Sequence, residues 1–308
     1  MLRIGTRGSK LALWQAEFVR EQLRSRSVMQ AEIVTIRTSG DVNQHVPIAQ
    51  SGLKGVFIKE LEDALLDGRV DCAVHSLKDV PTEIPGELEL AAVCERHDPR
   101  DCLVSRGGAP LRMLEQAARV GTSSLRRRAQ LLRIRADLQV IEMRGNVDTR
   151  LGKVERGEFD AVVLAKAGLD RLGLSARISE PFSADEMLPA VGQGALAIEC
   201  RKGDAGVGEA LRVLEHAATR AAVAAERAVL ARLQGGCQVP LGAYGRIKDG
   251  ILLLTAGVFS PDGQESVRGH ASGAPADAAF IGERLAESLL SKGAGRILEM
   301  AGRAAHGG

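Results

Sequence analysis

Cys237 stands in the stretch QGGCQVP (234–240), between a pair of glycines and a proline. Glycine-flanked loops usually lie at protein surfaces, whereas an unreactive cysteine is normally buried as a small hydrophobe. A thiolate is a soft nucleophile, and the thioether that it forms is not cleaved by water, so permanent attachment needs no neighbouring base. The pattern therefore favours an accessible, reactive thiol at Cys237. The remaining cysteines lie in or beside apolar runs: Cys72, Cys94, Cys102 and Cys200.

Asp79 is a second candidate, in the stretch HSLKDVP (75–81) that follows an apolar strand-like run. An aspartate beside a lysine is most often a solvated ion pair or a helix cap. The functional alternative is a carboxylate that faces an arginine-rich cleft and pairs with the only cationic part of an otherwise anionic ligand. Pro81 stops any helix here and holds the segment as a fixed turn.

Arginine outnumbers aspartate and glutamate between residues 121 and 150. The planar guanidinium fork matches carboxylates and phosphates, so the cluster indicates anion binding rather than a merely exposed basic face. Ser124 and the N–H groups of a helix start would add further donors. Three adjacent arginines cannot share one helix face at about 100° per residue, so we expect one of residues 126–128 to be solvated. The arginines are Arg126, Arg127, Arg128, Arg133, Arg135, Arg144 and Arg150.

Two repeated motifs predict the elements that position these side chains. RIGT at residues 3–6 matches RVGT at 119–122, and G-x-x-D-x-x-V occurs at 68–74 and again at 157–163. The common order of strand, Gly-Thr turn, helix and later strand predicts two α/β domains of similar plan, each with a parallel-type sheet. Ligands of such domains gather at strand carboxyl ends, where helix N-termini present free N–H groups. Two facing domains would line a cleft.

The rest of the chain suggests crossing segments and a third domain. The polar segment 95–101 and the stretch 188–200 read as crossings, and an alanine-rich helix from about 215, three strands and a last helix (279–300) follow. GQGALA (192–197) resembles a dinucleotide fingerprint, but a strand rather than a helix follows it, so we reject that reading. The weakly patterned segment 41–60 reads as a lid or as a plain mobile loop. The predicted domains are 1–95 plus 195–214, 99–190, and 215–308.

Composition excludes several classes of protein. The 308 residues carry a net charge of +2, five cysteines without a CxxC pair and six scattered histidines, so we expect no disulfide framework and no metal site. Neither a long apolar run nor a signal-like N-terminus occurs, so we expect a cytoplasmic protein without a membrane span. The near-neutral charge and one Trp, one Tyr and six Phe argue against nucleic acid as a partner.

The chain resembles the porphobilinogen deaminase family, also called hydroxymethylbilane synthases, over nearly its full length. The resemblance implies two lobes of the type II periplasmic-binding-protein kind and a small C-terminal α+β domain. This third domain would carry a dipyrromethane cofactor, covalently attached to Cys237. The motifs that carry the resemblance are RIGTRGSKLALWQ, KGVFIKELE, DCAVHSLKDVP, CERHDPRD, GTSSLRRR, RGNVDTRL, LAKAGLDRLG, LPAVGQGALAIEC and GGCQVPLGAY.

The resemblance also implies the reaction. Four porphobilinogen molecules are joined head to tail on the dipyrromethane primer, each losing ammonia, and water then releases the linear hydroxymethylbilane. Loss of ammonia leaves an electrophilic azafulvene with positive charge at its pyrrole nitrogen. A single carboxylate at Asp79 would stabilise that cation and manage the N–H proton. Acetate and propionate groups on each pyrrole explain the need for arginines.

Site residues follow from the matching positions. Asp79 is the catalytic residue. Cofactor binding is implied for Cys237, Lys78, Asp79, Ser124, Arg126, Arg127 and Arg144. Substrate binding is implied for Arg7, Ser9, Arg144, Arg150 and Gln193. A mobile loop beside the cleft is implied for Lys54, Phe57 and Lys59. The resemblance assigns no role to Arg128.

Two other functions stay open on the residues alone. A non-catalytic two-lobed binder of small polycarboxylates would use the arginines but would leave Cys237 unexplained. A nucleic-acid binder would use residues 121–150 and would show salt-dependent affinity. Domain rotation, loop movement and cofactor repositioning are all compatible with chain growth in one cleft. We expect a monomer, because no apolar interface helix is evident.

Overall fold

The computed structural model describes residues 1–27, 29–37, 58–233 and 239–306, and the chain divides into two compact units. Unit 1 comprises residues 1–97 and 194–220, and unit 2 comprises 98–193 and 221–308. Three residues singled out from the sequence, Lys54, Phe57 and Cys237, lie outside the described residues. No helix in the described ranges is both long and apolar enough to cross a bilayer.

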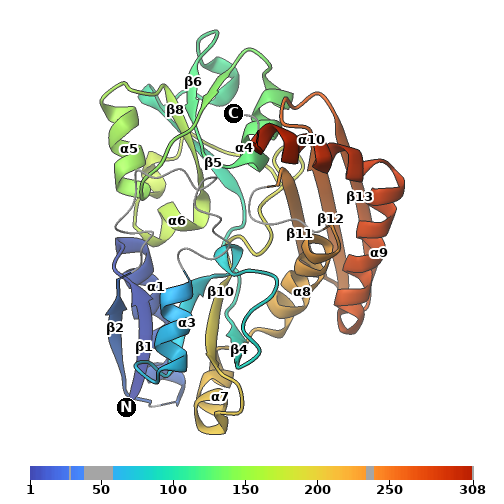
Figure 1. The fold of residues 1–308 in the computed structure, drawn as a ribbon. Helices are drawn as coiled ribbons and strands as arrows, with labels where there is room; N and C mark the ends of the chain where they lie inside the picture. The colour runs from blue at the N-terminus through green and yellow to red at the C-terminus, as the bar shows by residue number, and fades with distance from the viewer. Residues whose placement is uncertain (28, 38–57, 234–238, 307–308) are drawn as a thin grey trace. The chain divides into compact units, whose positions relative to one another are not determined.

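Unit 1 is built on a five-stranded sheet in the order β2-β1-β3-β10-β4 (Figure 1). Strand β1 runs parallel to β2 and β3, whereas β10 runs antiparallel to β3 and β4. The elements are β1 (Leu2–Arg7), α1 (Lys10–Ser27), β2 (Ala31–Ile36), α3 (Lys59–Leu66), β3 (Cys72–Ser76), the 3-10 helix η2 (Leu77–Asp79), β4 (Leu88–Val93), β10 (Leu196–Arg201), α7 (Ala205–Leu211) and η6 (Arg212–Leu214).

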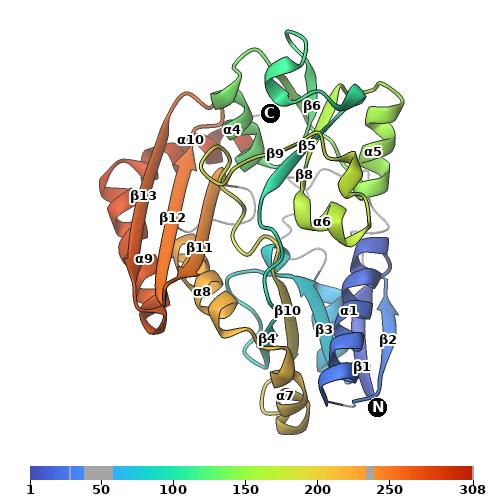
Figure 2. The same cartoon turned by 180° about the vertical axis from the view of Figure 1, so that it is seen from behind.

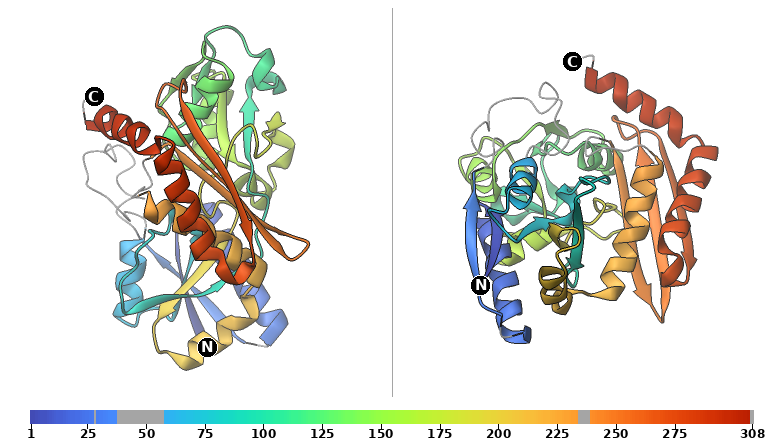
Figure 3. Two further views of the ribbon diagram at one scale, coloured as in Figure 1. Left: turned by 90° about the vertical axis from the view of Figure 1, so that its right-hand side faces the viewer. Right: turned by 60° about the horizontal axis from the view of Figure 1, so that its bottom comes forward.

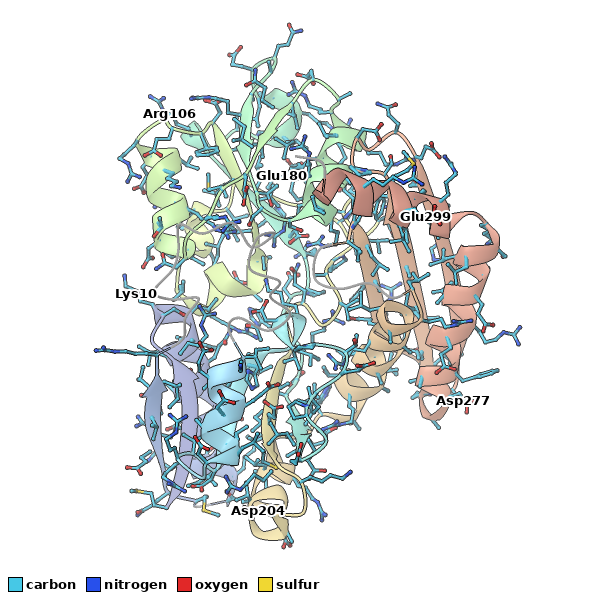
Figure 4. The ribbon with its side chains drawn as sticks, viewed as in Figure 1. Lys10, Arg106, Glu180, Asp204, Asp277 and Glu299 are labelled. Atoms are coloured by element: carbon cyan, nitrogen blue, oxygen red, sulfur yellow. The ribbon has the colours of Figure 1, made fainter. Side chains whose placement is uncertain are left out.

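Helices α1 and α3 cover opposite faces of this sheet. Val74 and Ile198 pack with α1, while the neighbouring Ala73 packs with α3, as the alternation of side chains along a strand requires. Asp204, labelled in Figure 4, precedes α7, and its carboxylate accepts a hydrogen bond from the Val207 N–H at 3.3 Å. This contact caps the helix and explains why it begins there.

Unit 2 contains a second five-stranded sheet, in the order β7-β6-β8-β5-β9. Helix α4 covers one face of the sheet, and α5 and α6 cover the other (Figure 2). The elements are β5 (Asp101–Ser105), η3 (Arg106–Gly108), η4 (Leu111–Met113), β6 (Arg119–Gly121), α4 (Leu125–Ile134), β7 (Gln139–Ile141), α5 (Val147–Glu155), β8 (Ala161–Ala165), α6 (Lys166–Arg171), η5 (Ser175–Arg177) and β9 (Glu180–Pro181).

The two sheets have the same order of equivalent strands, so the predicted common plan of the two α/β halves is confirmed. The predicted parallel-type sheet is wrong, because each sheet is mixed: β10 in unit 1 and β5 in unit 2 run antiparallel to their neighbours. Parallel pairing follows from helical crossovers between neighbouring strands. Strands β10 and β5 instead lie next to the crossings between the units, and no such crossover joins them to their neighbours.

The repeated motifs meet each other in both units. In unit 1 the Arg3 backbone N–H and guanidinium donate to the Asp71 carboxylate, with an Nη2–Oδ1 distance of 2.7 Å. In unit 2 the Arg119 N–H and guanidinium donate to Asp160 in the same way. This guanidinium lowers the pKa of Asp160. Each aspartate therefore ties the start of one parallel strand to the segment before its neighbour.

The C-terminal part of unit 2 is a three-stranded antiparallel sheet, β11-β12-β13, packed with helices (Figure 3). The elements are α8 (Ala217–Arg232), β11 (Leu241–Lys248), β12 (Ile251–Phe259), β13 (Ser266–Gly273), η7 (Pro275–Asp277), α9 (Ala278–Ser291) and α10 (Ala294–His306). The single last helix predicted from the sequence is wrong, because the chain turns at Gly293, whose φ of 98° lies in the region that favours glycine and ends α9.

Candidate functional site

Unit 1 has a pocket at the carboxyl ends of two neighbouring parallel strands. Arg7 ends β1, Asp79 lies in η2 directly after β3, and Ser9 precedes α1. As expected for such α/β domains, the carboxyl ends of β1 and β3 lie at one edge of the sheet in this unit. The lining residues are Arg7, Ser9, Leu11, Ala12, Gln15, Ile58, Leu61, Val74, His75, Ser76 and Asp79.

Local hydrogen bonds hold the walls of this pocket. The Ser9 hydroxyl accepts a bond from the Ala12 N–H at 3.3 Å and so caps the start of α1. Gln15 on α1 donates to the Ser76 hydroxyl at 2.9 Å and joins the helix to the end of β3. Asp79 is exposed, and within the described part of the chain no side chain pairs with its carboxylate. It is therefore available to a cationic group in the pocket, beside the half-buried Lys78.

In unit 2, Arg126 and Arg127 form ion pairs with a buried carboxylate that the sequence analysis did not single out. Asp101 is fully buried at the start of β5 and lies 2.6 Å from Arg126 Nη1 and 2.7 Å from Arg127 Nη2. Gln193 also donates to Asp101, at 2.9 Å. Burial alone would raise the pKa of Asp101, but the two guanidiniums outweigh it and lower the pKa well below its usual range. The cluster of Asp101 with two arginines keeps one net positive charge.

Arg150 on α5 is a cation of a different kind. Its guanidinium Nε donates to the Gly145 carbonyl at 2.8 Å, and no carboxylate among the described residues forms an ion pair with it. Gly145 has a φ of 114°, and a Cβ there would lie 2.7 Å from Thr149, so this turn requires glycine. Burial, and then the charge of Arg127, lower the pKa of Arg150 to about 10. An anion bound beside Arg150 would offset the unfavourable burial of its guanidinium charge.

The other predicted positions have the following places. Ser124 caps α4 by accepting a bond from the Arg127 N–H, and Arg144 follows β7 and donates to Glu142 at 2.7 Å. Lys59 is exposed at the first residue of α3. Arg128 is exposed and donates to the Val140 carbonyl, so the expectation that one of three adjacent arginines faces solvent is confirmed.

Replacing Asp101 by asparagine is expected to lower the free energy of unfolding by about 3–5 kcal/mol at pH 7, because two buried guanidiniums lose their counter-charge. The pKa of Asp101 is lower in the folded protein than in the unfolded chain. The contribution of ionised Asp101 to the free energy of unfolding is therefore complete above about pH 4, and it is lost as the pH falls through the pKa of Asp101 in the folded protein. Urea unfolding at pH 7 and at pH 3 measures the loss of stability and its dependence on pH. The exposed Asp137→Asn serves as control. Equal unfolding midpoints of Asp101→Asn and wild type at pH 7 would contradict the prediction.

Asp101 and the pair His75–Glu199 were missed by the sequence analysis. Asp101 lies in a polar segment that read only as a crossing, 25 residues from Arg126. A usable signal was available, because adjacent arginines on the inner face of an amphipathic helix need a buried carboxylate. His75 was quoted only as the start of a motif, and Glu199 only within a strand.

The chain is an α/β protein in which unit 1 has an exposed carboxylate in a pocket and unit 2 has cations suited to the acidic groups of a small molecule. Residues 2–209 match the family model described as porphobilinogen deaminase, dipyromethane cofactor binding domain, and residues 220–291 match its C-terminal domain. The chain belongs to the porphobilinogen deaminase family. This membership sets aside the two alternatives left open by the residues, a non-catalytic binder and a nucleic-acid binder.

Similar proteins extend over nearly the whole chain. Porphobilinogen deaminase from Pelobacter propionicus is 51% identical over 97% of this chain and 96% of that protein. The protein of the same name from Trichlorobacter lovleyi is 50% identical with the same coverage. Among solved structures, a periplasmic substrate-binding protein from Coxiella burnetii has a TM-score of 0.44 and 16% identity over 70% of this chain and 92% of that one. The predicted plan of two α/β lobes and a small C-terminal α+β domain is confirmed by the three sheets and the helices packed on them.

Proposed function

We propose that Asp79 is the catalytic residue with which this chain performs the reaction of its family. The protein polymerises four porphobilinogen molecules head to tail, releases ammonia and yields hydroxymethylbilane on a dipyrromethane primer. The observation that supports the role of Asp79 is its place in the pocket: its carboxylate, which pairs with no side chain of the described residues, lines the same pocket as Arg7 and Ser9. A pocket with both a carboxylate and a guanidinium suits a pyrrole that carries acidic side groups and develops positive charge on its ring during the reaction.

The residues fit a dipyrromethane. Each of its pyrroles carries an acetate and a propionate, and the cluster of Arg126, Arg127 and Asp101 keeps one net positive charge. When bound, the group supplies the pyrrole carbon from which the chain grows. We assign its carboxylates to Lys78, Ser124, Arg126, Arg127 and Arg144, and its thioether to Cys237.

The described cysteines support Cys237 as the anchor by their own burial. Cys72, Cys94, Cys102 and Cys200 are all buried. Burial raises the pKa of the Cys102 thiol to about 12 and that of Cys200 to about 11. Such thiols are inert as nucleophiles, because the thiolate is the reactive form. The family motif GGCQVP assigns the attachment to the one remaining cysteine.

Asp79 acts through its charge. As ammonia leaves the aminomethyl group of porphobilinogen, positive charge develops at the pyrrole nitrogen, and a carboxylate beside the ring N–H stabilises that charge. Arg7 and Ser9, which line the same pocket, hold the acetate and propionate of the incoming molecule, so that its ring is presented to Asp79. Substrate carboxylates are also assigned to Arg144, Arg150 and Gln193. Lys54, Phe57 and Lys59 are assigned to a mobile loop.

Arg150→Gln is expected to raise KM for porphobilinogen by about 10-fold to 100-fold, because a charged hydrogen bond to a substrate carboxylate is lost. The turnover number should change little, since the contact is the same before and during reaction. Steady-state assays of ammonia release measure both constants. The exposed Arg128→Gln serves as control and should leave KM unchanged; an unchanged KM in Arg150→Gln would remove this residue from the substrate site.

The finer organisation is also part of the proposal. We assign three domains, 1–95 plus 195–214, 99–190, and 215–308, supported by the three sheets. A cytoplasmic monomer is consistent with the buried free thiols and the lack of a spanning helix in the described residues.

The test of the function is release of ammonia and hydroxymethylbilane from porphobilinogen by the purified chain. Its failure, with dipyrromethane present by intact mass, would overturn the assignment.

A further inference from the structure

A histidine and a glutamate form a buried pair at the edge of the Asp79 pocket. His75 lines the pocket, and its Nε2 lies 2.9 Å from Glu199 Oε2. His75 pairs with Ala197 in the antiparallel register of β3 and β10, so Glu199, two residues further along, lies on the same face of the sheet. The side chain of His75 is 3% exposed and that of Glu199 is 0% exposed.

Among the described residues, the Glu199 side chain depends on His75. Glu199 Oε1 is buried and has no hydrogen-bond partner among the residues the structure describes, so His75 is the only one of them that bonds to the Glu199 side chain. A positive charge that forms on His75 would therefore be stabilised by this buried carboxylate. Glu62 on α3 completes the group, because burial and the nearby Glu199 raise its pKa. Three titratable side chains thus lead from the half-buried Glu62 to the pocket.

The proposed reaction needs a base as well as a stabilising carboxylate. The aminomethyl C–N bond breaks with its electron pair leaving on ammonia. An electron pair of the attacking pyrrole carbon then forms the new carbon–carbon bond. That carbon must finally lose its hydrogen as a proton, and the C–H electron pair restores the aromatic ring. Asp79, beside the ring N–H, is already occupied with the developing cation.

We propose that His75 is a second catalytic residue, which accepts this proton, and that Glu199 is its positioning residue. Glu199 takes the hydrogen bond of Nε2–H, so the lone pair that receives the proton is on Nδ1. The imidazolium formed is stabilised by the Glu199 carboxylate and returns its proton to ammonia or to solvent. The inference rests on the proposed function, since without carbon–carbon bond formation there is no proton to accept.

His75→Gln separates a catalytic role from a structural one, because the glutamine amide can still donate to Glu199 but cannot accept a proton. We expect turnover to fall by about 100-fold or more, the usual contribution of a general base. Thermal unfolding and the dipyrromethane content by intact mass should match the wild-type values. His216→Gln is the matched control: His216 lies in the same unit, bonded to Thr219 at 2.8 Å, and should keep full turnover.

Two measurements make the inference falsifiable. Porphobilinogen deuterated at its free α-carbon should give a larger isotope effect with His75→Gln than with wild type, because proton removal becomes slow. In the ¹⁵N-histidine-labelled full chain, His75 should be the neutral Nε2–H tautomer at the pH of the assay. Wild-type turnover in His75→Gln, an unchanged isotope effect, an Nδ1–H tautomer or a resting imidazolium would each overturn the role. Inactive wild-type protein would instead count against the proposed function.

Discussion

Asp79→Ala is expected to lower turnover by about 10³-fold or more while porphobilinogen still binds. The change removes the carboxylate that stabilises the cation left by departing ammonia, and electrostatic and proton-transfer contributions of this kind each amount to about 10²–10³-fold. Binding should persist because Arg7 and Ser9, the residues proposed to hold the substrate carboxylates, line the same pocket and are unchanged. Steady-state ammonia release and substrate binding to the loaded protein measure the two effects separately.

The design of this test uses a second aspartate of unit 1. Asp67 follows α3 on the surface and pairs with Arg69 at 3.5 Å, so Asp67→Ala should retain full turnover. Asp79→Glu keeps the charge but moves it by one methylene, and turnover should fall between the wild-type and alanine values. Near-normal turnover in Asp79→Ala would refute its catalytic role, provided that intact mass shows the same dipyrromethane content as in the wild type.

Cys237→Ser is expected to abolish activity by removing the primer. A serine hydroxyl is far less nucleophilic than a thiolate, and no thioether can form, so the protein should have the mass of the bare chain. The wild-type protein should be heavier by one dipyrromethane, and brief exposure to porphobilinogen should add further discrete masses as the bound chain grows. Intact-mass spectrometry under denaturing conditions measures all of these species.

A buried cysteine provides the matched control for the primer. Cys200 on β10 is fully buried, and burial raises the pKa of its thiol to about 11, so Cys200→Ala should keep the added mass. An active wild-type preparation with an unmodified Cys237 would contradict the proposed attachment. An added mass that persists in Cys237→Ser would place the primer on another side chain.

Local patterns predicted the scaffold well where one element determines its own structure. Leu11, Trp14 and Phe18 repeat at the i, i+3 and i+7 spacing typical of a helix, and all three lie in α1. Its buried face is formed instead by Ala16, Val19 and Leu23, and Trp14 stacks on Phe18 with a centroid distance of 5.5 Å. Periodicity thus identified the helix, but the face that is buried depends on the sheet beneath it.

Long-range partners were not predictable in the same way. Asp101 and Arg126 are 25 residues apart, and His75 and Glu199 are 124 apart, so only the folded chain brings each pair together. The repeated Gly-x-x-Asp and Arg-x-Gly-Thr motifs were visible, yet their meeting as Arg3–Asp71 and Arg119–Asp160 required the parallel pairing of β1 with β3 and of β6 with β8. Asp79 was singled out because it follows a strand-like run, and ligands gather at the strand ends of such sheets, whereas Arg7 came only from the family resemblance.

The position of β10 has a consequence for synthesis on the ribosome. This strand comes from residues 196–201 but lies between β3 and β4, whose residues are made more than a hundred codons earlier. The nascent N-terminal sheet is therefore incomplete, with open backbone edges, until translation has passed residue 201. The sheet of residues 101–181 has all its strands contiguous in the chain and is complete before then. Vectorial synthesis thus delivers the second lobe's sheet as a whole before the first lobe can be closed.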